Sequence, residues 1–223
     1  DYLKQFGLGS KLGIDFPGEI AGFIPSSEYF EKVYEDDRYW RAIYLRSLAI
    51  GQGEYEMTSL QIANFTAAIA NRGHWYTPHL VKEIREGNEQ ITRPVEVERH
   101  DIDIAPRHFE RVVSGMRQTV TYGTARWAQA PGIDICGKTG TVQNQFGDHS
   151  AFTAFAPQKD PKIALLVYIE NGGYGSTIAA PIASLMIEKY LKGEVSPSRK
   201  YLEKRMLEMD MTNRGASTIR EVK

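Results

Sequence analysis

The chain carries Gly132-Ile133-Asp134-Ile135-Cys136-Gly137-Lys138-Thr139-Gly140-Thr141, a stretch that fits two unrelated sequence patterns. Its residues 132–139 match G-x-x-x-x-G-K-S/T, a loop whose backbone amides and lysine hold phosphates at the start of a helix. Lys138-Thr139-Gly140 instead matches K-T-G, a pattern that lies along the edge of a strand. The two patterns therefore predict different local structures and different chemistry for the same residues.

The residues around this stretch favour the strand. A phosphate loop must follow a buried strand, and Ala128-Gln129-Ala130-Pro131 does not have the composition of one. Residues 133–136 alternate as a strand does, and Gly140 would stand where the helix should begin. No later predicted strand ends in an aspartate suited to magnesium. We expect a strand over 133–142 and keep a P-loop nucleotide hydrolase, with its site over Gly132 to Thr139, as the alternative.

The second half of the chain adds two strands and two helices to this strand. The further strands are predicted over Ser150–Ala156 and Ile163–Glu170, and their short connection predicts antiparallel pairing. One helix is expected over Pro106–Tyr122, with proline in its first turn, and another over Ser176–Leu191, which ends at Gly193. The prediction is an α+β fold in which helices pack against an antiparallel β-sheet.

The first half of the chain gives weaker signals, apart from one helix. Thr58 and Gln61 form a capping-box pattern that starts this helix, and Asn71-Arg72-Gly73 ends it. Its apolar residues occur on most sides, so we expect it deep in the core. Glu86-Gly87-Asn88 separates two alternating segments and predicts a β-hairpin. Residues 10–57 show no sustained period, and we expect a long irregular segment there.

The composition excludes several classes of function. Lysine and arginine total 27 against 28 aspartates and glutamates, so no overall positive field favours nucleic acid as a partner. The longest apolar run, Ile163 to Ile169, is far shorter than the roughly 20 residues that a spanning helix needs. Cys136 has no second cysteine with which to form a disulfide. The histidines lack the close spacing of a zinc site, so we expect neither a metal nor a cofactor; they are His74, His79, His100, His108 and His149.

Further motifs make the K-T-G pattern more specific. In their order along the chain, they resemble landmarks of the class B, monofunctional penicillin-binding proteins from Asp1 to about Gly193. The segment from Glu170 to Pro181 is most similar to the elongation-type subfamily. The matching motifs are Gly13-Ile14-Asp15-Phe16-Pro17-Gly18-Glu19, Ile50-Gly51-Gln52-Gly53, Thr58-Ser59-Leu60-Gln61, Gly137-Lys138-Thr139-Gly140-Thr141, Phe155-Ala156-Pro157 and Glu170-Asn171-Gly172-Gly173.

This resemblance implies a fold, an activity and a location. The fold would be part of a β-lactamase/transpeptidase-like domain. The parent protein would be a serine-type D,D-transpeptidase that cross-links the stem peptides of peptidoglycan through a serine acyl-enzyme and binds β-lactam antibiotics. It would act at the periplasmic face of the inner membrane, anchored by a segment outside this chain. Its partners would include the N-terminal half of the same protein and the cell-elongation machinery.

The residues of the K-T-G strand suit this chemistry. The edge of a strand offers unpaired amides and carbonyls to an extended peptide, and Gly140 removes a side chain where that peptide must approach closely. Lys138 supplies a positive charge that favours a substrate carboxylate and tunes the pKa of neighbouring hydroxyls. The Thr139 and Thr141 hydroxyls can donate hydrogen bonds to that carboxylate. By the resemblance, the backbone N–H of Thr141 is one of two oxyanion-hole donors. Lys138 and Thr141 are therefore our catalytic candidates, and Lys138 to Thr141 our substrate-binding candidates.

The chain departs from the family in one respect. The S-x-x-K motif, which holds the nucleophile and the acylation lysine, and the S-x-N motif both precede Asp1 in family order. We therefore expect residues 1–193 to be the C-terminal half of the transpeptidase domain, residues 194–223 a polar C-terminal tail with a short helix near 201–211, and the fragment inactive alone. A non-catalytic interaction domain remains a second alternative.

Overall fold

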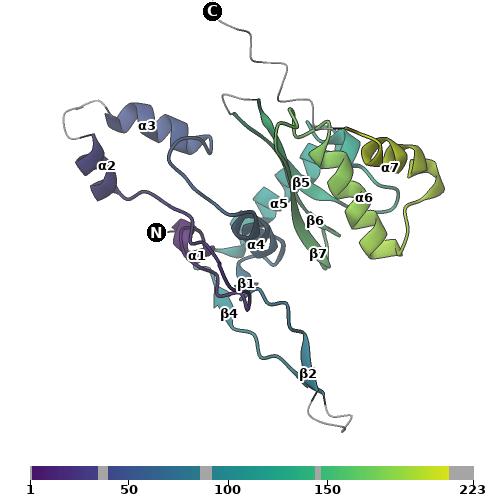
Figure 1. Cartoon of the computed structure of the whole chain (residues 1–223), viewed down its shortest axis with the longest axis horizontal. Coiled ribbons are helices and arrows are strands. Elements are labelled where there is room, and N and C mark those ends of the chain that lie inside the picture. The colour runs from purple at the N-terminus through teal and green to yellow at the C-terminus, as the bar shows by residue number, and fades with distance from the viewer. Residues whose placement is uncertain (1, 35–39, 86–91, 144–146, 211–223) are drawn as a thin grey trace, which may run out of the picture. The chain divides into compact units, whose positions relative to one another are not determined.

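The structure is a computed structural model that describes residues 2–34, 40–85, 92–143 and 147–210 (Figure 1). It divides into two compact units. Unit 1 comprises Asp1–Phe65 and His74–Ile102, and unit 2 comprises Thr66–Gly73 and Asp103–Lys223. Helix α4, Ser59–Ala70, therefore contributes residues to both units. None of the helices in the described ranges is long and apolar enough to cross a membrane.

Unit 1 holds short helices and two small antiparallel sheets. The helices are α1 (Tyr2–Gln5), α2 (Ser27–Val33), α3 (Trp40–Ala49) and the first part of α4; β1 (His74–Tyr76) pairs with β4 (Arg99–Asp101), and β2 (Glu83–Arg85) pairs with β3 (Thr92–Pro94). The pairing of β2 with β3 confirms the predicted hairpin, although its turn, Glu86-Gly87-Asn88, lies outside the described residues.

The prediction of a long irregular segment over residues 10–57 was wrong, because α2 and α3 lie within it. Helix α2 begins after Ser26, whose hydroxyl accepts a hydrogen bond from the backbone N–H of Tyr29 at 3.2 Å. This N-cap satisfies one of the amides that a helix start leaves unpaired. Both helices are short, so neither repeats an apolar period often enough to be recognised from the sequence.

The predicted capping box is present and also organises unit 1. The backbone N–H of Gln61 donates to the Thr58 hydroxyl at 3.1 Å, and the backbone N–H of Thr58 donates to Gln61 Oε1 at 3.0 Å. The other end of the same buried amide donates to the carbonyls of Ser10 and Ala21, each at 2.7 Å. One glutamine therefore starts the helix and holds the preceding irregular chain against it.

Unit 2 is built on the predicted three-stranded antiparallel sheet. Its strands are β5 (Cys136–Val142), β6 (His149–Ala156) and β7 (Ile163–Ile169), in the order β5-β6-β7. The first strand begins later than the expected residue 133. Ile133 instead forms an isolated bridge with Ala130, which turns the chain before β5 starts.

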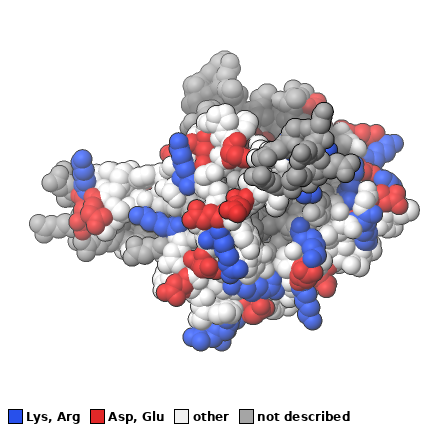
Figure 2. Space-filling view, turned by 90° about the horizontal axis from the view of Figure 1, so that it is seen from below, with Lys and Arg blue, Asp and Glu red and all other residues white. Residues whose placement is uncertain are grey.

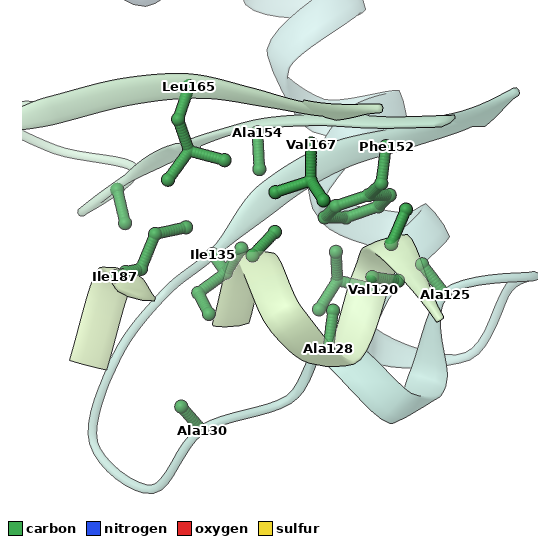
Figure 3. Close-up of a cluster of buried hydrophobic side chains, with 14 of the residues drawn as sticks. Val120, Ala125, Ala128, Ala130, Ile135, Phe152, Ala154, Leu165, Val167 and Ile187 are labelled. Carbon is green, nitrogen blue, oxygen red and sulfur yellow. The ribbon is translucent and has the colours of Figure 1, made fainter. Parts of the chain in front are cut away.

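Helix α6, Ala179–Lys192, packs on one face of this sheet (Figure 3). Alanines at 179, 180 and 183 bring the helix close to the strands, where Phe152 is fully buried. Phe152, Ala154, Leu165 and Val167 are directed toward the helix (Figure 3). Truncating such a buried phenylalanine to alanine costs about 3–5 kcal/mol, so this contact contributes strongly to the stability of unit 2.

The end of α4 and helix α5, Pro106–Thr121, complete unit 2. The Thr66 hydroxyl of α4 hydrogen-bonds to the Thr153 hydroxyl of β6. Arg72 donates from Nε to Glu110 of α5 at 3.0 Å and from Nη2 to the carbonyl of Gln158 at 2.9 Å. These bonds tie the end of α4 to α5, to the sheet and to the turn that follows β6.

The chain beyond Gly193 is more closely packed than its polar composition predicts. Gly193 ends α6 with φ 81°, after which come η2 (Pro197–Arg199) and α7 (Lys200–Leu207), the predicted short helix. Val195 and Leu202 are buried against Leu185 of α6. Residues 194–207 are therefore a packed part of unit 2, while the end of the expected tail, 211–223, lies outside the described residues.

A buried ion pair joins this segment to α6. Arg199 Nη1 donates to Glu188 Oε2 at 2.6 Å, and the Ser196 hydroxyl donates to Glu188 Oε1 at 2.6 Å. Burial raises the pKa of Glu188, but the hydrogen bonds from Ser196 and Arg199 and the charge of Arg199 outweigh this effect and leave the pKa below its ordinary value. The ionised pair therefore stabilises the folded state above the pKa of an unfolded glutamate, and this contribution is lost as the pH falls through the lower folded pKa.

We predict that Arg199→Met lowers the free energy of unfolding at neutral pH by about 3 kcal/mol, because it leaves the buried Glu188 carboxylate with only the longer contact to Lys192 Nζ, at 3.5 Å, as its ion pair. The variant should become more stable as the pH falls and Glu188 is protonated, which is the opposite of the wild-type trend. Thermal unfolding between about pH 3 and pH 7 measures both effects. The matched control is Lys204→Met, which removes an exposed cation of α7 and should cost less than about 1 kcal/mol. Equal losses in the two variants would contradict the assignment.

Candidate active site

The stretch that contains Lys138 to Thr141 lies on β5, at the edge of the sheet of unit 2. Among the described strands, β5 pairs only with β6. The register places Lys138 opposite Thr153, Gly140 opposite Ala151 and Thr141 opposite Ser150. No described strand pairs with the other side of β5, so its backbone groups there are not used within the sheet.

The four predicted site residues lie consecutively on this strand. Strand alternation places Lys138 and Gly140 on one face of the sheet and Thr139 and Thr141 on the other. Lys138 is exposed, and its Nζ donates to the carbonyl of Thr139 at 2.6 Å. No carboxylate in the described part of the chain pairs with Lys138. Its charge is therefore available to an anionic ligand.

Thr124 is a member of this site that the sequence analysis missed. Its hydroxyl lies 3.0 Å from the hydroxyl of Thr139, within hydrogen-bond distance. Thr124 follows the end of α5, and α5 packs against β5. A threonine after a helix carries no sequence signal for this contact, because only the packing of α5 brings the two hydroxyls together.

The loop between β7 and α6 covers the end of β5 and β6. A side chain at Gly175 would bring its Cβ within 2.5 Å of the Gly140 carbonyl oxygen and 2.2 Å of the Ala151 carbonyl oxygen. The buried Ser150 hydroxyl donates to the Tyr174 carbonyl at 3.1 Å and accepts from the backbone N–H of Ala179 at 3.2 Å. Ser150 thus fixes this loop beside the candidate site. At this close approach any side chain at position 175 would collide with the two carbonyl oxygens, so the loop requires glycine there.

The two glycines of β5 meet different surroundings. A Cβ at Gly137 would lie 2.3 Å from the ring of Phe152, whereas a Cβ at Gly140 would lie 3.3 Å from the Cβ of Ala151. Gly137 is therefore required by the core, because the ring occupies the space of its missing side chain. Gly140 has only a methyl group as its nearest neighbour, so packing alone does not demand glycine there.

Two other polar groups near the strand are held in structural roles. The Cys136 thiol is fully buried, and desolvation raises its pKa to about 11, so it is not a thiolate nucleophile at neutral pH. His149 Nδ1 accepts a hydrogen bond from the backbone N–H of Asn171 at 2.9 Å. The 223 residues contain no serine that is followed three positions later by lysine.

The phosphate-loop alternative was wrong. Its last residues, from Cys136 to Thr139, lie in β5, and the chain continues as a strand instead of entering a helix. A phosphate loop needs a helix at this point to supply backbone amides. Within the described ranges, no group of three or more histidine, cysteine, aspartate or glutamate side chains is placed to hold a metal ion.

Comparison with known proteins gives a consistent result. The profile of the penicillin binding protein transpeptidase domain matches residues 1–188. The peptidoglycan D,D-transpeptidase MrdA of Haemophilus influenzae is 34% identical over 223 aligned residues, which cover 90% of this chain and 34% of that protein. The chain thus spans about a third of the length of this curated relative.

Solved structures resemble the chain over most of its length. Pseudomonas aeruginosa PBP2 in complex with WCK 5153 has a TM-score of 0.71 and 34% identity, covering 88% of this chain and 44% of that one. Helicobacter pylori PBP2, in its complex with MreC, has a TM-score of 0.67 and 28% identity, covering 85% and 34%. The imipenem acyl-enzyme of penicillin-binding protein A from Mycobacterium tuberculosis has a TM-score of 0.66 and 26% identity, covering 86% and 41%.

We predict that Gly137→Ala destabilises the protein by about 1–3 kcal/mol, because the added methyl group must displace the ring of Phe152. Gly140→Ala is the matched control on the same strand and should change the stability by less than about 1 kcal/mol, since only the Ala151 methyl group is near. Chemical denaturation monitored by circular dichroism measures both. A larger loss at 140 than at 137 would contradict the packing described for β5.

Proposed function

This chain belongs to the penicillin-binding protein transpeptidase family, and we propose that it forms part of an elongation-type peptidoglycan D,D-transpeptidase. Such an enzyme joins stem peptides through a serine acyl-enzyme, and a β-lactam acylates the same serine. The observation that carries the proposal is the open strand β5, with Lys138, Thr139, Gly140 and Thr141 along it. We propose residues 1–193 as the C-terminal half of the transpeptidase domain.

The proposed substrate, an extended stem peptide, binds as an additional strand beside β5. Main-chain hydrogen bonds then supply affinity, and the side chains of the strand supply specificity. Gly140 supports this role, because it leaves room for close approach at a position where the core does not require glycine.

The lysine, the threonine hydroxyls and one backbone amide of the strand have separate roles in binding the carboxylate and stabilising the oxyanion. Lys138 attracts the carboxylate of the peptide or the β-lactam, because no carboxylate of the described residues neutralises it. Thr139 and Thr141, on the other face of the strand, donate hydroxyl hydrogen bonds to that carboxylate, while Lys138 acts on it through its charge rather than by direct contact. Thr124 orients the hydroxyl of Thr139. The backbone N–H of Thr141 stabilises the oxyanion that forms when the serine attacks the carbonyl carbon.

We place the nucleophilic serine outside this chain. Acyl transfer needs a serine activated by a nearby base, and no serine among the 223 residues has a lysine at the S-x-x-K spacing. The chain then supplies one wall of the site, with a carboxylate-binding group and one oxyanion donor. On its own it is inactive.

The relatives suggest the partners and the location. A structural relative forms a complex with MreC, and another forms an acyl-enzyme with imipenem. We propose that the protein assembles with cell-elongation proteins of the MreC kind and binds β-lactams. It works at the periplasmic face of the inner membrane, held by an anchor outside this chain.

In the full-length protein, Lys138→Ala should slow acylation by a β-lactam by about a hundredfold, because it removes the charge that stabilises the bound anion and the transition state. Stopped-flow measurement with a fluorescent penicillin gives the rate, and thermal unfolding should be unchanged. Lys162→Ala, which removes an exposed lysine beside β7, should leave the rate unchanged. An unaltered acylation rate in Lys138→Ala would refute the role assigned to this lysine.

Covalent labelling locates the nucleophile. The full-length protein should gain the mass of one penicillin, and peptide mapping should place the adduct on a serine outside the 223 residues of this chain. The chain alone, once shown to be folded by circular dichroism, should gain no mass under the same conditions. An adduct on any serine within this chain would overturn the division of the site, and the absence of any adduct in the full-length protein would favour a non-catalytic domain.

A further inference from the structure

Unit 2 contains a second concave surface that shares no residue with the β5 site. It is a cleft of about 330 Å³ between η1 (Arg126–Ala128), the loop after η1 and the start of α7. Small-molecule sites begin at about this size. The lining residues used below are Arg126, Trp127, Gln129, Pro131, Arg199 and Tyr201.

Two large aromatic side chains line the cleft while remaining exposed. Trp127 of η1 is 58% exposed, and Tyr201 of α7 is 64% exposed. Exposed aromatic surface is costly in water, and when it lines a hollow it commonly marks a binding site. The two rings come from elements that are distant in sequence, so the fold creates their common position.

Three polar groups on the residues that line the cleft lack protein partners. In the described part of the chain, the Arg126 guanidinium, the Trp127 indole N–H and the Tyr201 hydroxyl make no hydrogen bond or ion pair. They offer donors from Arg126 and Trp127 and a donor or acceptor from Tyr201. A ligand of this cleft therefore meets apolar ring faces and polar groups at their margins.

Other contacts hold the walls in place before any ligand binds. Gln129 Nε2 donates to the carbonyls of Val120 and Thr121 at 3.0 and 2.8 Å, and Lys192 Nζ donates to the carbonyl of Pro131 at 2.6 Å. Arg199 is neutralised by Glu188, as described above. A preformed cleft loses little entropy on binding, and Arg126 is its one unpaired cation among the described lining residues.

A pyranose ring has the matching chemistry. In N-acetylglucosamine, the axial C–H groups form an apolar face that stacks on an aromatic ring, and the equatorial hydroxyl and acetamido groups form a polar margin. A nucleotide would need more cations than Arg126 alone, because its phosphates carry several charges. An apolar peptide would leave the donors of Arg126 and Trp127 unsatisfied.

We propose that this cleft binds a sugar ring of a glycan strand, with Trp127 and Tyr201 as stacking surfaces and Arg126 as a hydrogen-bond donor. The occupant follows from the proposed function, on which this inference rests. Peptidoglycan consists of glycan strands joined through peptides, and the β5 site addresses only the peptide. The cleft would hold a glycan strand while its peptide reacts, and would do so without taking part in acyl transfer.

Calorimetric titration of the full-length protein with the N-acetylglucosamine tetrasaccharide tests the proposal. Trp127→Ala should raise the dissociation constant about tenfold or more, because it removes a stacking surface, and Trp127→Phe should restore most of the affinity. Tyr201→Ala should also weaken binding, which keeps the test valid if Trp127→Ala does not fold. Tyr190→Ala is the matched control, since Tyr190 is 62% exposed on α6 but does not line the cleft.

The same variants are then acylated with a fluorescent penicillin. The rates should equal that of the wild type, because the cleft shares no residue with the β5 site. Failure of the wild type to bind the tetrasaccharide at millimolar concentration, or equal binding by wild type and the Trp127→Ala and Tyr201→Ala variants, would overturn the proposal. Tighter binding of a sugar-free peptide in the cleft would also overturn it. If the wild type binds the tetrasaccharide but is not acylated, the proposed function is contradicted and the cleft remains a sugar site. Slower acylation in the Trp127→Ala or Tyr201→Ala variant than in the wild type would contradict the separation of the cleft from acyl transfer.

Discussion

The contact between the ring of Phe152 and the backbone of Gly137 is the constraint on which the rest of unit 2 depends. The ring is fully buried and occupies the space that any side chain at 137 would need. Because strand side chains alternate, shifting β5 by one residue would bring Lys138 onto the face that α6 covers, where its charge would be buried. The ring therefore fixes both the close packing of the sheet and the exposure of the lysine on β5.

Buried polar groups near this contact hold the segments that form the two proposed sites. Ser150, beside Phe152 on β6, holds the loop before α6 and thereby positions Gly175 against the carbonyl of Gly140. At the other end of α6, Glu188 binds Arg199 and so fixes the start of α7. The chain thus uses an apolar contact for the sheet and buried, fully bonded polar groups where loops join it.

On the face drawn in Figure 2, the described basic and acidic side chains are interspersed and neither sign gathers into a patch.

The sequence predicted the helices and strands that are marked by neighbouring residues. It did not predict the features that depend on contacts between residues far apart in the chain. Thr58 and Gln61 define a helix start within four residues, and the continuous apolar run from Ile163 to Ile169 coincides with β7, so these elements were found. Helices α2 and α3 are too short for a period to show, and the packing of 194–207 rests on two apolar residues within a polar run. The K-T-G strand was identified from its motif, but Thr124 and Gly175 were missed, because tertiary packing alone brings them to β5.

Under the proposed function, Lys138 would also let an open strand edge bind a peptide without pairing indiscriminately. An uncharged edge pairs readily with any extended chain. Lys138, exposed on one face of the edge strand, opposes such pairing because its charge must remain solvated or paired. A peptide that carries a carboxylate satisfies the charge, whereas one without a carboxylate must bury it unpaired. Under this proposal, Lys138 would discriminate between peptides by an attraction to those that carry a carboxylate and a penalty against those that do not. Gly140 would complement this proposed arrangement, since a larger residue beside the lysine would hold the peptide away from the backbone of β5.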